Sequence, residues 1–327
     1  YLTLKLSGLI KTSISMASGS GLLDLRKSCW DPELLEFLGV DEAQMPEIAT
    51  DSFSFNSSNW EQLRNAKWLS AIGDGAANNI GAGCVERSKA ALMIGTSGAM
   101  RVAFEGDVPA QIPRGLWCYR IDNRRLIVGG ALSDGGGLYR WLKDTLKIAE
   151  VDDEVEAAIA EREPDSHGLT FLPFLAGERS TGYHENAKGA IIGLTQNTSS
   201  VEITQAAMES VAYRFANIVE RLEQFTKLET IIASGGALRE SPVWTQIIAD
   251  ILGKNLSLPD TREASSRGVV LLALENSGHI PDLTKTETPE GKEFHFNSEK
   301  HLIYKTARKR HEHFYQKLIA AENSEQR

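Results

Sequence analysis

From residue 66 onward, short apolar segments end in glycine-rich turns that often lead into helical patterns. Strands that alternate with helices are typical of sheets covered by helices, so this order predicts an α/β fold. No repeat of fixed short period accompanies the pattern. The predicted strands are residues 68–72, 90–94, 126–128 and 230–233, and residues 90–94 and 100–104 are expected to form a hairpin.

Several segments carry helix signals. Residues 199–225, the longest, place apolar side chains at spacings of three and four. Residues 31–39 begin with an N-cap aspartate followed by proline and end in glycine. Further helices are predicted over residues 76–84, 138–146, 264–276 and 298–321 and from Ser241 and Pro242 onward, with residues 284–292 as a polar linker.

Composition excludes several classes of protein. The chain has 327 residues, of which 42% are hydrophobic and 24% charged, so a globular protein with about two domains is expected. A net charge of −9 argues against a nucleic-acid partner, and no apolar run approaches the roughly 20 residues of a membrane span. Cys29, Cys84 and Cys118 lack metal or disulfide spacing, and residues 7–25 lack the features of a signal peptide. We therefore expect a cytoplasmic protein with neither a nucleic-acid nor a membrane partner.

Glycine-rich turns at predicted strand ends are the main chemical signal. Glycine lets the backbone approach a phosphate closely, and a following helix start points free N–H groups at it. One such turn is more often a plain connection, but three in one chain, with hydroxyls from Thr96, Ser97 and Ser234, favour phosphate binding. Residues 81–83 lie inside a predicted helix, residues 95–99 miss GxSxG, and GxxxxGK[ST] does not occur, so a dinucleotide fingerprint, a hydrolase and a P-loop are disfavoured.

Some charged residues allow two interpretations. Asp74, between two glycines at a predicted strand-to-helix turn, is either a helix N-cap or a general base that accepts a proton from a hydroxyl, and both roles are compatible. Arg101 either reaches a substrate carboxylate or is solvated at a strand end. For Glu178 and Arg179, an ion pair that braces a surface loop is favoured.

The remaining charged groups are expected to be solvated. Residues 150–156 form an acidic run at a predicted helix start. His311 and His313, two residues apart on a helix, point to different faces, which disfavours a metal pair. The histidines expected in solvent are His279, His295, His301, His311 and His313.

Taken together, these segments resemble the FGGY family of carbohydrate kinases, whose fold is that of the actin-like (ribonuclease H-like) ATPases. The most specific stretch is GAIIGL at residues 189–194 followed by EITQAAME at residues 202–209, which is similar to the family's C-terminal signature. GDGAA at residues 73–77 resembles the segment with the catalytic aspartate, GTSG at residues 95–98 the phosphate hairpin, and SGGA at residues 234–237 the nucleotide turn. The resemblance extends from about residue 8 to residue 283.

The resemblance implies transfer of phosphate from ATP, with Mg²⁺, to a hydroxyl of a small sugar or sugar acid. Asp74 would be the catalytic base and would contact the substrate together with Gly75 and Arg101. No residue is assigned to the metal. The residues implied to hold the nucleotide are Thr96, Ser97, Gly98, Gly136, Gly235, Gly236 and Ala237.

Within the family, the chain is most similar to gluconate kinases. The stretches that carry this likeness are SMASGSGLL at residues 15–23, MIGTSGAMR at 93–101, WCY at 117–119 and FLPFLAGERS at 171–180. Gluconate is therefore the expected substrate. A ketopentose of the xylulose type and a non-catalytic actin-like nucleotide-binding module are the alternatives, and a homodimer is left open.

One family feature has no counterpart in the sequence. The Asp-x-Gly-Thr phosphate loop of the N-terminal portion does not occur, and the chain opens at Tyr1 within a segment that reads as a strand. We therefore expect residues 1–88 to be the end of a first, sugar-binding domain and residues 89–327 a complete second, nucleotide-binding domain with a C-terminal helix. The natural protein is expected to begin upstream, the 327-residue chain alone to be inactive, and an upstream segment to restore activity.

Overall fold

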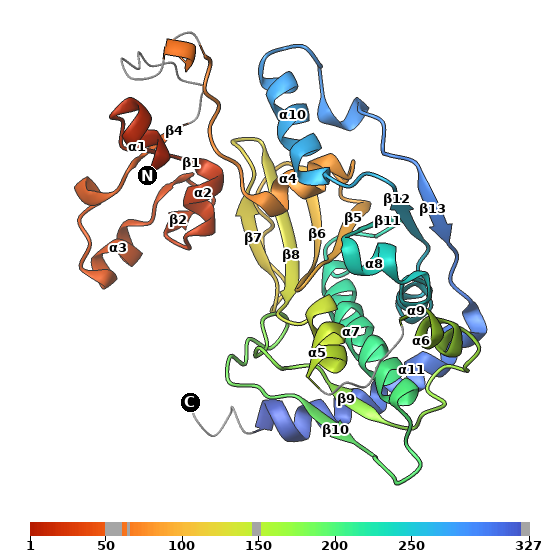
Figure 1. The fold of residues 1–327 in the computed structure, drawn as a ribbon. Helices are drawn as coiled ribbons and strands as arrows, with labels where there is room; N and C mark the ends of the chain where they lie inside the picture. Colours follow the sequence, from red (N-terminus) through yellow and green to blue (C-terminus); the bar gives the residue numbers. More distant parts are fainter. Residues whose placement is uncertain (50–60, 64–65, 146–151, 322–327) are drawn as a thin grey trace.

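A seven-stranded sheet forms the centre of the computed structural model, which describes residues 1–49, 61–63, 66–145 and 152–321 (Figure 1). Its strand order is β13-β12-β11-β5-β6-β8-β7, and the predicted α/β fold is confirmed. The strands are β5 (Lys89–Ile94), β6 (Gly98–Glu105), β7 (Trp117–Arg120), β8 (Arg125–Leu132), β11 (Thr230–Ser234), β12 (Leu256–Pro259) and β13 (Gly291–Phe294).

Parallel and antiparallel strands divide this sheet. β11 runs parallel to β5 and to β12, whereas β6, β8 and β7 form an antiparallel meander and β13 adds an antiparallel edge. Met93 of β5 lies opposite Ser234 of β11. Because parallel strands end at the same edge of a sheet, the glycine-rich turns after β5 and β11 are neighbours.

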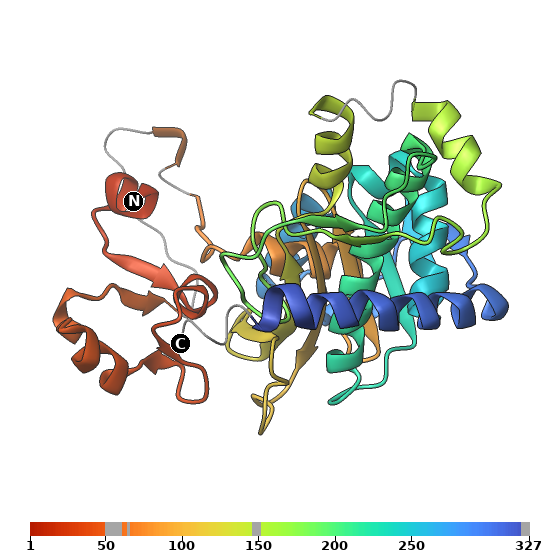
Figure 2. The ribbon, with the colours of Figure 1, turned by 90° about the horizontal axis from the view of Figure 1, so that it is seen from below.

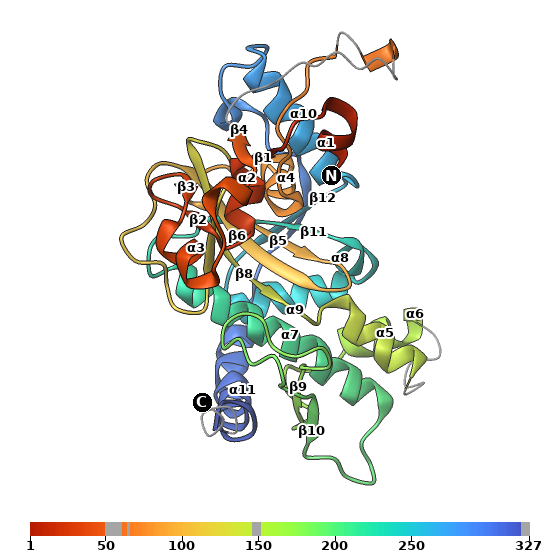
Figure 3. The same ribbon diagram turned by 90° about the vertical axis from the view of Figure 1, so that its left-hand side faces the viewer.

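Alternating side chains on the strands build a separate core on each face of the sheet. Met100 and Val102 of β6 pack with α7 (Ser200–Leu222) and α9 (Pro242–Leu252). Ala103 and Ile127 point the other way, toward α4 (Asp74–Gly81) and α10 (Ala264–Asn276). Figure 3 shows the sheet between these two helix pairs.

Other helices surround the sheet. Figure 2 shows α11, in dark blue, crossing the main part of the molecule. The remaining elements outside the central sheet in this part of the chain are α5 (Gly136–Asp144), α6 (Asp152–Ala160), α8 (Gly236–Glu240), α11 (Ser298–Tyr315) with a π-helical turn at Gln316–Ala320, the 3-10 turn Leu283–Lys285, and the antiparallel pair β9 (Thr170–Leu172) and β10 (Ala190–Ile192).

The N-terminal part has a small core of its own, beside β7 (Figure 1). Ser18 joins it to the sheet, since its hydroxyl accepts from the Arg120 N–H (3.0 Å). The elements are α1 (Leu2–Ser7), β1 (Lys11–Ser13), α2 (Ile14–Gly19), β2 (Leu23–Asp24), β3 (Cys29–Trp30), α3 (Pro32–Leu38), β4 (Glu47–Ala49) and the 3-10 turns Glu42–Gln44 and Glu61–Leu63.

Most predicted elements are confirmed, and three are wrong. Residues 68–72 form no strand beyond an isolated bridge at Trp68, because they run between the N-terminal part and the sheet instead of along a partner strand. The chain opens in helix α1, which ends at Gly8 in the left-handed region, instead of in a strand. The expected linker at residues 284–292 contains the first residues of β13, whose exposed edge position explains its polar sequence.

Several predicted helices differ at their ends. The helix predicted over residues 76–84 is α4, which ends at Gly81, and the one predicted over residues 199–225 is α7, which ends at Leu222. The helix with Ser241 at its start is α9, and the short α8 precedes it. α5 ends at Asp144, and residue 146 of its predicted range lies outside the described residues. Within the described part of the chain, no helix combines the length and the apolar character that crossing a bilayer requires.

Candidate active site

Two cavities meet at the turn between β5 and β6. The first, which we call the Asp74 cavity, has a volume of about 460 Å³ and is lined by Asp74, Gly75, Ser97, Gly98 and Arg101, among others. The second, the Thr96 cavity, has about 500 Å³, and its lining includes Thr96, Gly136, Gly236 and Ala237. Nine of the ten site residues expected from the sequence and its resemblance therefore line one cavity or the other, and the hairpin turn contributes residues to both.

Backbone hydrogen bonds join this hairpin turn to the start of α5. The N–H of Gly136 donates to Gly95 O (2.8 Å), and that of Gly137 donates to Thr96 O (2.9 Å). A Cβ on Gly136 would lie 2.7 Å from Gly95 O and 2.9 Å from the Cβ of Ala237. Only glycine therefore lets the three turns approach each other this closely.

Gly235 does not belong to the described lining of the Thr96 cavity. Its φ is +103°, and a Cβ there would overlap the carbonyl oxygen of Ile94 at the end of β5. Gly236 is open, with Glu240 Oε1 at 3.9 Å as the nearest atom. The hydroxyl of Ser234 donates to Leu92 O (3.4 Å), so this expected phosphate-binding hydroxyl is used within the sheet.

Asp74 begins α4 with an exposed carboxylate. The N-cap position belongs to Gly73, and the Asp74 Oδ1 accepts from the N–H of Gly75 (2.7 Å), so the aspartate serves the first turn but is not the N-cap. The Gly73 N–H also donates to the hydroxyl of Ser15 (3.1 Å). At the other end of α4, a Cβ on Gly81 would overlap the carbonyl of Ala264 in α10. Both ends of the helix that carries Asp74 are thus fixed.

Arg101 lies in the wall of the Asp74 cavity. Its Nη1 is buried and has no hydrogen-bond partner among the described residues. Burial lowers the pKa of Arg101, the charge of Asp74 opposes that change, and Arg179 adds to it. A Cβ on Gly75 would lie 3.0 Å from the Arg101 Nε, so a glycine beside Asp74 makes room for this guanidinium. An anionic group in the cavity would supply the missing acceptor.

The expected ion pair between Glu178 and Arg179 is wrong. Glu178 is buried, and its carboxylate accepts from Arg214, from the hydroxyl of Tyr315 (2.8 Å) and from the N–H of Gly182 (3.2 Å). Arg179 is exposed and lines the Asp74 cavity. A buried carboxylate requires buried donors, which α7 and α11 supply from remote parts of the sequence.

Several other residues line the two cavities and were not predicted from the sequence. Trp117 and Tyr119 stack with their ring centroids 4.4 Å apart in the lining of the Asp74 cavity. Glu156, expected in solvent, accepts from the hydroxyl of Ser241 and the N–H of Val243 (3.3 Å) at the start of α9. Residues 150–151 of the same acidic run lie outside the described residues. For Arg179, Trp117 and Tyr119, the signal was present, because they belong to the stretches similar to gluconate kinases.

The histidines divide into two groups. His279, His295 and His313 are exposed, as expected. His311 is buried, and burial together with Arg214 and Arg308 lowers its pKa to about 3. His301 is half-buried with its Nδ1 2.8 Å from Asp250 O, so the expectation of solvent exposure is wrong for both.

Neither cavity contains a group of three or more described residues that could together hold a metal ion. One group of suitable residues, Asp165, His167 and Glu209, lies elsewhere. There, His167 Nδ1 accepts from the N–H of Leu169 (2.9 Å), its Nε2 lies 3.1 Å from Glu209 Oε2, and Asp165 pairs with Arg310. Asp74 is the one carboxylate in the described lining of its cavity. Mg²⁺ commonly takes one or two carboxylates and completes its shell with phosphates and water, which a single aspartate beside a nucleotide would satisfy.

Known proteins resemble the chain over most of its length. The model of the C-terminal domain of the FGGY family of carbohydrate kinases matches residues 90–276, and that of the N-terminal domain matches residues 1–64. A gluconokinase from Bacillus licheniformis is 29% identical over 299 residues, which cover 86% of this chain and 58% of that protein. A glycerol kinase from Halorhodospira halophila is 30% identical over 270 residues, covering 80% of this chain and 53% of that protein.

Solved structures agree with this likeness. A xylulose kinase from Lactobacillus acidophilus has a TM-score of 0.88 at 27% identity, and a gluconate kinase from the same organism has 0.87 at 27%. Each comparison covers 97% of this chain and 66% of the other, and the chain spans little more than half the length of the curated relatives it matches. The expected actin-like ATPase fold is confirmed. With more than half of its residues matched by the C-terminal domain model, the chain belongs to the FGGY family of carbohydrate kinases.

Proposed function

We propose that this protein transfers the γ-phosphoryl group of ATP to a hydroxyl of a sugar acid, with gluconate as the first candidate. One observation carries the proposal. The exposed carboxylate of Asp74 and the unpartnered Nη1 of Arg101 share a cavity with Ser97 and Gly98, whose turn also lines the Thr96 cavity. A general base and a cation thus lie next to a phosphate-binding turn.

Asp74 is the residue that accepts the proton in this proposal. As the substrate hydroxyl attacks the γ-phosphorus, its proton moves to the Asp74 carboxylate, a new oxygen–phosphorus bond forms, and the bond to the β–γ bridging oxygen breaks to release ADP. Thr96, Ser97 and Gly98 hold the phosphates, and Gly136, Gly235, Gly236 and Ala237 shape the nucleotide side. Mg²⁺, bound with the nucleotide, would neutralise phosphate charge.

Arg101 favours an acidic substrate over a neutral one. Its buried guanidinium has a free donor, and Arg179 adds a second cation to the same cavity. A carboxylate would accept from Arg101, whereas a ketopentose or glycerol would leave a buried charge without an ionic partner. The proposal therefore assigns Arg101, with Gly75 and Asp74, to the substrate.

The domain boundaries, the cellular location and the partners are proposed as well. We propose that residues 1–88 belong to the sugar-binding domain and residues 89–327 to the nucleotide-binding domain, which the separate matches to residues 1–64 and 90–276 support. All three cysteines are free, which fits a reducing, cytoplasmic location. The partners are then small molecules, and a homodimer is left open.

A coupled assay of ADP release tests the proposal. Gluconate, xylulose and glycerol are each tested as substrates of the 327-residue chain and of a form that carries additional residues before Tyr1. We expect the extended form to turn over gluconate fastest and the chain alone to be inactive. Preference for xylulose would support the ketopentose alternative. ATP binding without turnover of any sugar by either form would support a non-catalytic module.

A further inference from the structure

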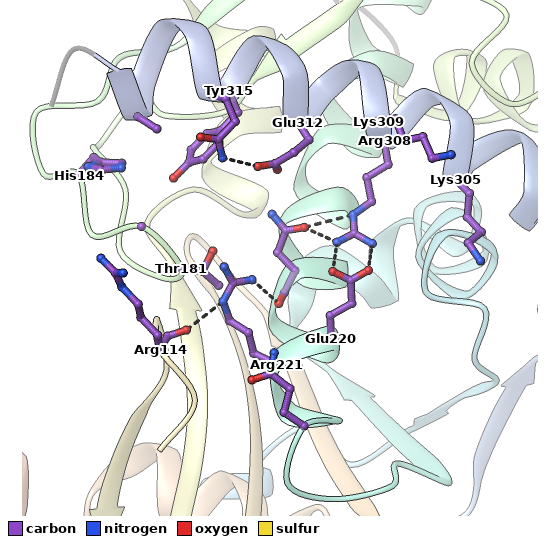
Figure 4. Close-up of a pocket in the computed structure, with 15 residues that line it drawn as sticks. Arg114, Thr181, His184, Glu220, Arg221, Lys305, Arg308, Lys309, Glu312 and Tyr315 are labelled. Carbon is purple, nitrogen blue, oxygen red and sulfur yellow. Dashed lines mark hydrogen bonds and ion pairs between the residues drawn. The ribbon is translucent and has the colours of Figure 1, made fainter. Parts of the chain in front are cut away.

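A third and larger cavity lies between α7 and α11, with a volume of about 930 Å³ (Figure 4). We call it the α7–α11 cavity. Arg221 reaches it from α7, Arg114 from the segment before β7, and Lys305, Arg308 and Lys309 from α11. Volumes of this order are typical of sites that hold small molecules.

Positive charge predominates in this cavity. Its lining contains five basic side chains and two carboxylates, Glu220 and Glu312. Both carboxylates already have partners. Glu220 accepts hydrogen bonds from both terminal nitrogens of Arg308 (2.6 Å each), and Glu312 accepts one from the side-chain amide of Gln316 (2.6 Å).

The other four cations are Arg114, Arg221, Lys305 and Lys309, and none of them makes an ion pair with a described residue. Unpaired positive charge therefore surrounds the cavity.

Backbone carbonyl groups hold the side chain of Arg221 in place, and one of them belongs to Arg114. Arg221 donates from Nε to Arg114 O (3.0 Å) and from Nη1 to Asn217 O (3.0 Å). Gly115 has a φ of +90°, and a Cβ there would overlap the carbonyl oxygen of Thr181 and lie 3.2 Å from the Arg221 Nε. The glycine thus lets the Arg114 segment pack directly against Thr181 and Arg221.

The guanidinium of Arg221 is bound to carbonyl dipoles instead of to a carboxylate. Burial lowers the pKa of Arg221, the neighbouring Arg214 lowers it further, and the charges of Glu220 and Glu312 oppose the change. Arg221 is half-buried, and neutral carbonyls offset only part of the cost of placing a cation there, so an anion in the cavity would be favoured. Figure 4 shows the Arg114 and Arg221 side chains beside Thr181, which offers a hydroxyl on the same side.

We propose that the α7–α11 cavity binds a small molecule that carries a diphosphate or two phosphate groups. Guanidinium groups match phosphate oxygens with two parallel hydrogen bonds, and several unpaired cations favour a ligand with more than one charge. The site differs from the proposed active site. Thr181 and His184 line the α7–α11 cavity, whereas Arg179, on the same loop, lines the Asp74 cavity.

Isothermal titration calorimetry of the 327-residue chain with inorganic pyrophosphate, without Mg²⁺ and at low salt, tests the proposal. We expect binding that Arg114→Gln weakens about tenfold, which corresponds to the loss of one charged hydrogen-bonding partner. The Arg114 side chain has no hydrogen bond to a described residue, so this variant is expected to fold normally. Arg114→Gln combined with Arg221→Gln should abolish binding.

Two control variants locate the bound pyrophosphate. Lys292→Gln removes an exposed positive charge from β13, and Arg101→Gln removes one of the cations of the Asp74 cavity. Both should bind pyrophosphate as the unmodified chain does. The proposal is overturned if no binding is detected at millimolar pyrophosphate, if Arg114→Gln binds as well as the unmodified chain, or if Arg101→Gln abolishes the binding. Since the readout is binding alone, the result does not depend on kinase activity.

Discussion

At the scale of single residues, Arg101 is the side chain that we propose to select an acidic substrate over a neutral one. The buried Nη1 of Arg101 has no hydrogen-bond partner among the described residues, which costs folding free energy unless a ligand accepts a hydrogen bond from it. The Asp74 carboxylate lines the same cavity, where it can accept a proton from a hydroxyl of a bound substrate. The pairing of a carboxylate that attracts a proton with a guanidinium that attracts a carboxylate suits a molecule with a hydroxyl and an acid group.

Arg101→Met should therefore discriminate between acidic and neutral sugars. We expect the affinity for gluconate to fall by about 10- to 100-fold, the cost of about 1.5–3 kcal/mol for a hydrogen bond to a charged group. Xylulose and glycerol should bind as before. Calorimetric titration of the variant against each sugar measures this, with Lys292→Gln as the control for loss of a distant charge. Equal gluconate affinity in Arg101→Met and the unmodified chain would remove Arg101 from the substrate site.

The sequence predicts some residue roles and not others for a physical reason. Asp74 and Thr96 are predictable because their glycine neighbours mark turns whose conformation is local. Glu178 and Arg179 are adjacent in the sequence, yet one is buried against α7 and α11 and the other lines a cavity. Which of two neighbours is buried depends on distant donors, Arg214 and Tyr315, that no local pattern reveals.

At the scale of elements, the turn between β11 and α8 provides a matched pair of glycines. An alanine at Gly235 would meet the Ile94 carbonyl and a φ of +103°, whereas Gly236 is open. We expect Gly235→Ala to lower the free energy of unfolding by about 1–3 kcal/mol and to weaken ATP binding. Gly236→Ala should change the stability by less than about 0.5 kcal/mol.

Urea unfolding and ATP titration of the two glycine variants measure the difference. If Gly235→Ala were as stable as Gly236→Ala and bound ATP equally well, the close approach of the β11–α8 turn to β5 would have no energetic consequence.

The position of His311 in α11 predicts a pH dependence of stability. Its folded-state pKa is about 3, below the ordinary value of 6.5, because burial and nearby arginines disfavour the charged ring. Below about pH 6.5, the unfolded chain therefore binds a proton that the folded chain does not. The free energy of unfolding should fall as the pH is lowered, and this group contributes at most about 1.4 kcal/mol per pH unit.

Denaturant unfolding near pH 7.5 and pH 5.5 tests this contribution. His311→Phe should lose less stability over that range than the unmodified chain, by about 1 kcal/mol. His313→Gln, which alters an exposed histidine in the same helix, should keep the full dependence. An identical pH dependence in His311→Phe and the unmodified chain would contradict a neutral buried ring.

Elements were predictable where their signal is contained within the segment. The apolar spacing along α7 and α10 and the turn between β5 and β6 each suffice to define a helix or a hairpin. The strand expected at residues 68–72 and the unexpected β13 fail for the opposite reason, since a strand exists only where a partner is available. Trp68 forms an isolated β-bridge and no strand, whereas Gly291 of β13 pairs with Pro259 of β12.

At the scale of the whole molecule, the loop at residues 179–184 contributes side chains to two cavities. Arg179 faces the Asp74 cavity, and Thr181, Gly182 and His184 face the α7–α11 cavity. A ligand that shifts this loop on one side should alter binding on the other, and such a coupling is reciprocal. We expect saturating pyrophosphate to change the Kd for gluconate at least about fivefold in the unmodified chain.

Arg114→Gln is the variant that separates this coupling from direct competition for the Asp74 cavity. In this variant, gluconate should bind equally with and without pyrophosphate, because the α7–α11 cavity no longer holds the anion. An unchanged Kd for gluconate in the unmodified chain would show that the two cavities are independent.

Asp74 is the proton acceptor on which the proposed phosphoryl transfer depends. The direct measurement is kcat for gluconate phosphorylation by Asp74→Asn, in the form of the protein that turns over gluconate, with the exposed Asp107→Asn as the control. We predict that kcat falls by about 10²–10⁴ in Asp74→Asn, the share of a general base, while the KM values and the thermal unfolding midpoint stay the same. A loss of less than about tenfold in a normally folded variant would contradict the account.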